Sequence, residues 1–145
     1  MTDSRFEVDK DFIKRGLARN EDDYFKVTGS ELSLLWHAPY YFINSEIIAA
    51  SQEMNYTYVS RDVDPLDWIA PGSGVRSADL YMPAADILER VLEQKKPGSI
   101  IPVRIGKTQP ERGDYLFHSL DILIDELISL GYTIVPVTRL IEHAE

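Results

Sequence analysis

The sequence contains no cysteine, only three histidines and no long apolar segment. The absence of cysteine excludes both disulfide bonds and thiolate zinc sites. No apolar run approaches the roughly 20 residues that a membrane span needs, and the first residues lack the apolar core of a signal peptide. No two histidines have H-x-x-H or H-E-x-x-H spacing, so the chain alone does not supply a recognisable metal site.

Basic residues are also in the minority. The chain has 15 Lys and Arg against 24 Asp and Glu, a formal net charge of −9. This balance disfavours nucleic acid as a partner, because binding to phosphates needs clustered cations. Neutral or cationic partners fit it better. The length of 145 residues and the apolar content of 44% predict one globular domain over residues 1–145.

Apolar periodicity predicts helices and strands that alternate along the chain. One helix is followed by four strand-helix units, an order that predicts an α/β fold with parallel strands and right-handed crossovers. Four such units are half of a closed barrel, so we expect either a small open sheet or part of a distorted (β/α) barrel. The expected helices are Asp9–Val27, Ser45–Glu53, Ala84–Gln94, Tyr115–Leu130 and Arg139–His143, and the expected strands are Ser33–Trp36, Tyr56–Val59, Ser99–Ile105 and Tyr132–Val137.

The residues that bound these elements give further expectations. Gly29 is placed to end the first helix in a left-handed conformation. Asp114 can cap the helix that follows it, and Thr138 can cap the last helix. Ile69–Met82 holds two glycines, a proline and two serines, so this stretch is predicted to be a long loop.

Polar and aromatic side chains gather just after three of the expected strands. Because parallel strands end at the same edge of a sheet, these groups are expected to share one rim. The first strand end supplies His37, Tyr40 and Tyr41, the second supplies Asp64, Asp67 and Trp68, and the third supplies Arg104.

Each of these residues also has a structural interpretation. His37 beside a proline is most often a hydrogen-bonded loop residue, and turn chemistry alone favours aspartate in the second loop. Trp68 either plugs the end of a barrel or lines a pocket. Arg104 at the end of an apolar strand is explained equally by an ion pair with Asp64 or Asp67 and by a catalytic role.

The order of these motifs resembles the polysaccharide deacetylases, the NodB-homology carbohydrate esterases. Trp36 to Tyr40 (WHAPY) is similar to a motif that typically reads Arg-Pro-Pro-Tyr, and Asp64 to Trp68 (DPLDW) matches the next motif, Asp-x-x-Asp-Trp. Lys96 to Ile101 (KPGSII) resembles the segment that leads into the last motif of the family, Leu-x-His. Leu120 to Val137 is similar to the closing helix and strand, so the resemblance covers about Ser33 to the end.

The resemblance implies a distorted barrel of which this chain is the C-terminal half. It also implies metal-assisted removal of N-acetyl or O-acetyl groups from carbohydrate, with a divalent, zinc-like ion. The metal ligands of the family lie in an Asp-Asp pair and a His-x-x-x-His motif, which are absent here and are expected before Met1. No cofactor is therefore expected in this chain alone. By the resemblance Tyr40, Asp64, Asp67 and Arg104 take catalytic positions, and His37, Tyr41 and Trp68 contact an acetylated glycan.

Two departures from the family pattern bear on activity. His37 stands where the family has arginine, and Arg104 stands where it has the histidine acid. Arginine is a poor proton donor near neutrality, because its pKa lies above about 12. We therefore expect a divergent deacetylase-like domain that is inactive as this chain.

Two alternatives stay open, a non-catalytic carbohydrate-binding or protein-interaction domain on the same fold, and a stand-alone α/β domain whose likeness is accidental. Half of a barrel would also leave sheet edges exposed. We expect the chain to self-associate through those edges or to cover them with its own helices.

Overall fold

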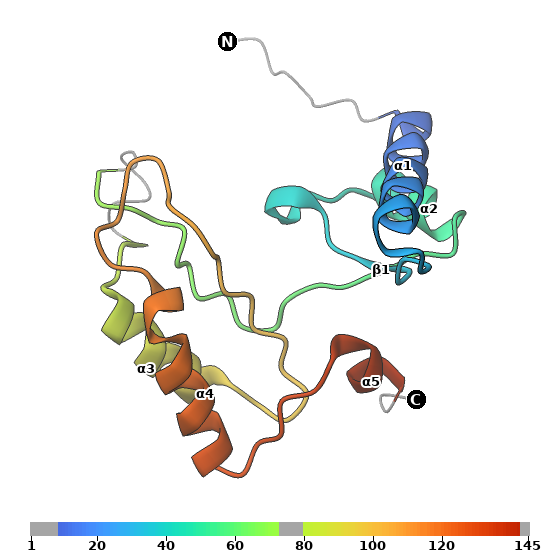
Figure 1. Ribbon diagram of the computed structural model, residues 1–145. Coiled ribbons are helices and arrows are strands. Elements are labelled where there is room, and N and C mark those ends of the chain that lie inside the picture. Colours follow the sequence, from blue (N-terminus) through green and yellow to red (C-terminus); the bar gives the residue numbers. More distant parts are fainter. Residues whose placement is uncertain (1–8, 73–79, 143–145) are drawn as a thin grey trace. The chain divides into compact units, whose positions relative to one another are not determined.

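The computed structural model describes residues 9–72 and 80–142. The chain divides into two compact units, Met1–Ser60 and Arg61–Glu145 (Figure 1). The fold is mixed α/β and mostly helical, and the described residues form one sheet of two parallel strands. The α/β class is thus confirmed, whereas the barrel and the single-domain organisation stay predictions.

The first unit combines two helices with the strand pair. Its long helix begins and ends where the sequence predicts. The Asp9 carboxylate accepts the backbone N–H of Asp11 at 3.0 Å, and Gly29, at φ +68°, donates its own N–H to the Phe25 carbonyl at 2.8 Å. The elements are α1 (Lys10–Thr28), β1 (Leu35–Trp36), the 3-10 helix η1 (Pro39–Tyr41), α2 (Ser45–Gln52) and β2 (Thr57–Tyr58).

Strands β1 and β2 are parallel neighbours, as expected. Leu35 pairs with Thr57 and Trp36 with Tyr58, and α2 forms the crossover between the strands. The Asn44 side chain caps α2 by accepting the Ile47 N–H at 2.8 Å. This β-α-β unit places the residues that follow Trp36 at the carboxyl end of β1.

Packing within the first unit joins α1 to α2 and to the start of β2. Tyr56 is buried, and its hydroxyl donates to the Glu21 carboxylate of α1 at 2.8 Å. Burial, helped by that carboxylate, raises the pKa of Tyr56 to about 12. The phenol is therefore neutral at physiological pH and serves as a structural donor.

The second unit contains two long helices that contact each other (Figure 1). Apolar side chains of these helices and of the neighbouring segments form its core. Its elements are α3 (Ala84–Gln94), the 3-10 helix η3 (Leu116–Ser119), α4 (Leu120–Ser129) and α5 (Val137–Glu142). Helix α3 has the predicted bounds. The core is formed by Val63, Ile87, Val91, Leu116 and Leu123, with partly buried Met82, Leu88, Leu92, Ile101, Val103, Leu120 and Leu127 around it.

The strand prediction for Ser99–Ile105 is wrong, since no strand forms there. The Ile100 carbonyl accepts the N–H groups of Asp62 and Val63 at 3.0 and 3.5 Å, but the Ile100 N–H donates to the Asp62 carboxylate. The Arg104 N–H likewise donates to the side chain of Asp67. Carboxylates thus take the donors that a backbone ladder would need.

The strand prediction for Tyr132–Val137 is also wrong. Helix α4 ends with the Tyr132 N–H bonded to the Leu127 carbonyl at 3.0 Å, and α5 already begins at Val137. Thr138 consequently lies inside α5 instead of capping it. The expected end of that helix at His143 lies outside the described residues.

Asp114 does not cap the helix that follows it. Its carboxylate accepts the N–H of Ala84, the first residue of α3, at 2.6 Å, and the hydroxyl of Tyr81 at 3.1 Å. The predicted helix from Tyr115 to Leu130 is instead divided into η3 and α4. The loop predicted at Ile69–Met82 is described only at 69–72 and 80–82, and neither end holds an α-helix or a strand.

Candidate functional site

The predicted site residues fall into two groups, one in each unit. In the first unit, the chain leaves β1 and turns through Tyr40 and Tyr41, both in the left-handed region at φ +56° and +57°. The rings of His37 and Tyr41 stack with centroids 5.3 Å apart, while Tyr40 is 77% exposed. Left-handed backbone at two bulky residues is strained, and such strain concentrates at ligand sites.

In the second unit, the Asp64–Trp68 segment is an irregular loop with alternating burial. Pro65, Asp67 and Ile69 are buried, and Trp68 between the last two is 45% exposed. A left-handed residue, Leu66 at φ +55°, sits at the centre of the loop. The buried residues anchor the loop in the unit, and this anchoring presents the indole outward.

Asp64 holds the start of this loop. One of its carboxylate oxygens accepts the Leu66 N–H at 3.1 Å, and the other pairs with the Arg61 guanidinium at 2.6 Å. The turn chemistry expected of this aspartate is thus present. Its cationic neighbour is Arg61, and no ion pair joins it to Arg104 within the described residues.

Asp67 is the buried carboxylate of the site. It is 6% exposed, and burial raises its pKa, although the Arg104 N–H at 2.7 Å and nearby arginine charges oppose the rise. A carboxyl group of raised pKa suits proton exchange or hydrogen bonding to a hydroxyl.

Within residues 9–72 and 80–142, Arg104 does not form the ion pair that was one of its two sequence interpretations, and its catalytic role stays a prediction. Its side chain is exposed, and it reaches Asp67 through the backbone N–H, with no ion pair in the part of the chain that the structure describes. The guanidinium still lowers the pKa of Asp67 through its charge. A buried Arg104–aspartate ion pair is therefore not what holds the loop.

Two arginines that the sequence reasoning missed lie against the loop. Arg90 of α3 donates to the carbonyls of Asp64 and Pro65, and Arg112 donates to the carbonyl of Ile69. The sequence could have indicated Arg90 as a partly buried cation, since it lies one residue before the inward-facing Val91. Nothing in the sequence indicates Arg112, because it lies in a polar loop without a recognisable motif.

The described residues do not fit a metal. No three His, Asp or Glu side chains among residues 9–72 and 80–142 cluster as ligands. Neither do the described helices include one that is long and apolar enough to cross a bilayer.

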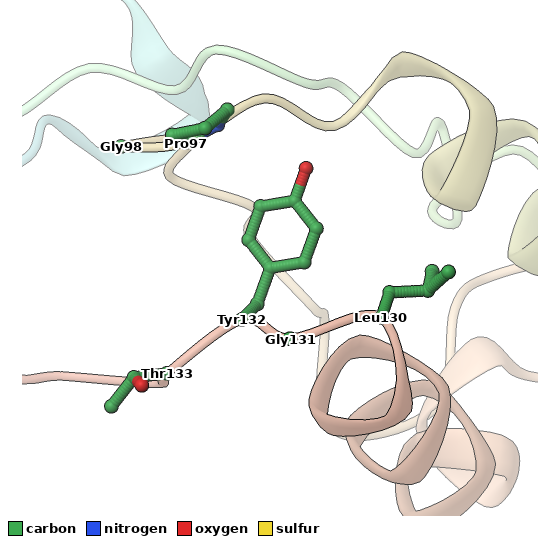
Figure 2. Close-up of a pocket in the computed structure, with 6 residues that line it drawn as sticks. All are labelled: Pro97, Gly98, Leu130, Gly131, Tyr132 and Thr133. Carbon is green, nitrogen blue, oxygen red and sulfur yellow. The ribbon is translucent and has the colours of Figure 1, made fainter.

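A shallow pocket of about 480 Å³ lies elsewhere in the second unit. It holds none of the predicted site residues and is lined by residues just before, or at the start of, the two stretches where strands were expected. Figure 2 shows the Tyr132 ring at its centre. The lining residues are Pro97, Gly98, Leu130, Gly131, Tyr132 and Thr133. The Asp64–Trp68 loop is the stronger candidate, because it combines the buried carboxyl group of Asp67 with the half-exposed indole of Trp68.

The structure thus brings His37 together with Tyr41, and Asp67 together with Asp64, Trp68 and the backbone of Arg104. Whether the two groups share one rim stays a prediction. No protein-family model matches the chain, and no curated protein is significantly similar to it.

Proposed function

We propose that this chain is a divergent polysaccharide deacetylase-like domain whose Asp64–Trp68 loop binds acetylated carbohydrate without hydrolysing it. The observation that carries the proposal is the pairing of a half-exposed indole, Trp68, with a buried carboxyl group, Asp67, on one anchored turn. Sugar rings offer an apolar face and a rim of hydroxyls, and sites for such ligands combine an aromatic surface with few fixed polar groups.

The residues of the site have different roles in binding the proposed ligand. The Trp68 ring supplies apolar area at low conformational cost, and Asp67 exchanges a hydrogen bond with a hydroxyl or amide of the ligand. In the first unit, Tyr40, Tyr41 and His37 offer an aromatic surface of their own at the end of β1. The net charge of −9 agrees with a neutral ligand.

The fold part of the proposal is that both units belong to a distorted barrel of strand-helix repeats. The parallel β1–β2 pair with its α2 crossover supports this assignment. In the second unit, the Ile100 carbonyl accepts two N–H groups from Asp62 and Val63, so these extended segments lie side by side without a full ladder.

The absence of hydrolysis follows from the residues in the motif positions. Arg104 stands where the family has its proton-donating histidine, and arginine is a poor general acid. The sequence holds no His-x-x-x-His motif to supply the metal ligands of the resemblance. The proposed role of Asp64, Asp67, Tyr40 and Arg104 is therefore to hold a ligand.

Calorimetric titration tests the binding part. We expect N-acetylated chito-oligosaccharides or acetylated xylo-oligosaccharides to bind the chain and to lose about tenfold or more in affinity when Trp68 is replaced by alanine, roughly 1.4 kcal/mol. The control is Phe12→Ala, which removes a 65% exposed aromatic ring of α1. Binding that survives Trp68→Ala would exclude this loop as the sugar site.

Acetate release with added zinc tests the catalytic part. We expect no acetate from the 145-residue chain. Release of acetate that disappears with Asp67→Asn would show instead that the chain is an enzyme.

A second candidate, a protein-interaction domain, is favoured by one observation. Tyr40 and Phe42 are each 77% exposed beside the half-exposed Ile43 at the end of β1. Such a patch suits a protein partner as well as a sugar. Loss of sugar binding in Trp68→Ala but not in Phe42→Ala would assign this patch to another partner.

A further inference from the structure

Two guanidinium groups from outside the Asp64–Trp68 loop hold its backbone. Arg90 Nη2, from α3, donates to the carbonyl oxygens of Asp64 and Pro65 at 3.0 and 2.5 Å. Arg112 Nη1 donates to the carbonyl oxygen of Ile69, the residue directly after Trp68. The two contacts therefore bracket the indole-bearing part of the loop.

Arg112 is itself fixed on every side. Its side chain is fully buried, with Nη2 bonded to the Met82 carbonyl at 2.6 Å and Nε bonded to the Asp114 carbonyl at 3.0 Å. The guanidinium also lies 4.9 Å from the centre of the Tyr81 ring and 3.6 Å from the Asp114 carboxylate. A group held in this way transmits little motion to the loop that it binds.

Arg90 is held less completely. Its Nη1 contacts Met82 Sδ at 3.2 Å, while its Nε is buried with no hydrogen-bond partner among the described residues. A buried donor without a partner is costly. Arg90 is therefore a poor choice for stabilising the core alone, and its two bonds to the loop are its main polar interactions.

We propose that Arg90 and Arg112 are positioning residues, a two-point clamp that fixes the orientation of the Trp68 indole and the Asp67 carboxyl group. The clamp holds the carbonyls of Pro65 and Ile69, which lie before and after the strained residue Leu66, toward the interior of the unit. The indole of Trp68 is thereby turned outward. The use of this orientation in sugar binding rests on the proposed function. The clamp itself can be tested without any ligand.

The ligand-free test follows Trp68 fluorescence in a Trp36→Phe background. Trp36 packs edge-on against Tyr58, and its buried Nε1 has no hydrogen-bond partner within residues 9–72 and 80–142. Phenylalanine therefore keeps the ring contact and removes this donor. Arg90→Lys replaces the planar fork by a single ammonium group, which cannot reproduce its geometry at two carbonyls. We expect acrylamide quenching of Trp68 to rise by about twofold and its anisotropy to fall, because the loop gains freedom.

The matched control is Arg139→Lys, in the exposed part of α5, which should leave both signals unchanged. Millimolar guanidinium added to Arg90→Ala should restore the native quenching. Native quenching in Arg90→Lys, or no effect of guanidinium, would overturn the proposal. Arg112→Lys is expected to give the larger effect, since its side chain has no access to water.

A measurement on the unsubstituted chain makes the result independent of how the variants fold. The clamp predicts separate, slowly exchanging Nη proton signals in NMR spectra for Arg90 and Arg112, in contrast to averaged signals for Arg139. Averaged Arg90 signals would overturn the clamp. A confirmed clamp with no sugar bound would instead leave this inference standing and reject the proposed function.

Discussion

At the scale of single residues, burial changes the acid–base chemistry of Asp67. Burial raises its pKa, so the folded chain holds this proton more tightly than the unfolded chain does. The stability that this group contributes is fully present below the unfolded pKa of about 3.9 and is lost as the pH rises through the folded pKa. Urea unfolding should therefore show wild type losing stability relative to Asp67→Asn over that pH range. A gain relative to Asp67→Asn would contradict the assigned direction.

A comparison of Asp67→Ala with Asp67→Asn separates the contribution of the hydrogen bond from that of the charge. Alanine leaves the Arg104 N–H without its acceptor at 2.7 Å, so we expect a loss of about 1–3 kcal/mol in the free energy of unfolding. Asparagine keeps an acceptor and should cost less. Equal losses in the two variants at neutral pH would show that the bond is not important for stability.

The left-handed backbone of Tyr40 is predicted to lower the free energy of unfolding. Its φ of +56° disfavours any residue except glycine, and its ring is mostly exposed. Tyr40→Gly should raise the free energy of unfolding by about 1 kcal/mol, because the left-handed backbone is then unstrained. Tyr40→Ala keeps the strain and serves as the control. Glycine that destabilises more than alanine would show that the ring makes a needed contact.

The residue types of the site could be predicted from the sequence, but their partners could not. Asp64, Asp67 and Trp68 lie together because they share one short segment. The side chain that neutralises Asp64 is Arg61, and the loop is held by Arg90 and Arg112, which come from 25 to 43 residues away along the chain. Contacts over such separations depend on packing, which one sequence does not encode locally.

At the scale of elements, Asp114 joins distant parts of the second unit. It caps α3 from a loop 30 residues further along, and it also binds Tyr81 and Arg112. Asp114→Ala should lower the free energy of unfolding by about 2 kcal/mol or more, since a helix cap is lost together with the partner of the buried Arg112 guanidinium. Asp121→Ala, in the first turn of α4, is the control. Equal effects of the two changes would contradict the capping assignment.

The helices were predictable and half of the strands were not. Helices α1 and α2 follow local apolar spacing and local caps, and α3 follows local apolar spacing. The bounds of all three agree with expectation within one or two residues. Ser99–Ile105 has strand composition, but its N–H groups donate to Asp62 and Asp67 side chains. A strand forms only when its N–H and C=O groups pair with the backbone of a neighbouring strand. The apolar periodicity of one segment does not show whether side chains elsewhere will take those N–H groups instead.

At the scale of the whole molecule, the strand pair leads to a prediction about association. Within the described residues β1 and β2 pair only with each other, so each strand presents one free edge. We expect concentration-dependent self-association in sedimentation velocity. Thr57→Lys should weaken it, because charge beside an edge opposes strand pairing. A sedimentation coefficient independent of concentration would show that the edges are covered.

We propose the Asp64–Trp68 loop as a preformed sugar site, and the chain contains an internal control for this proposal. It has two indole N–H groups, one on half-exposed Trp68 and one buried on Trp36. The most direct measurement is a ¹H–¹⁵N NMR titration of the full chain with acetylated chito-oligosaccharide. We predict a saturable shift of the Trp68 indole signal with little change at Trp36. An unchanged Trp68 signal at millimolar sugar, or a shift at Trp36 alone, would contradict the account.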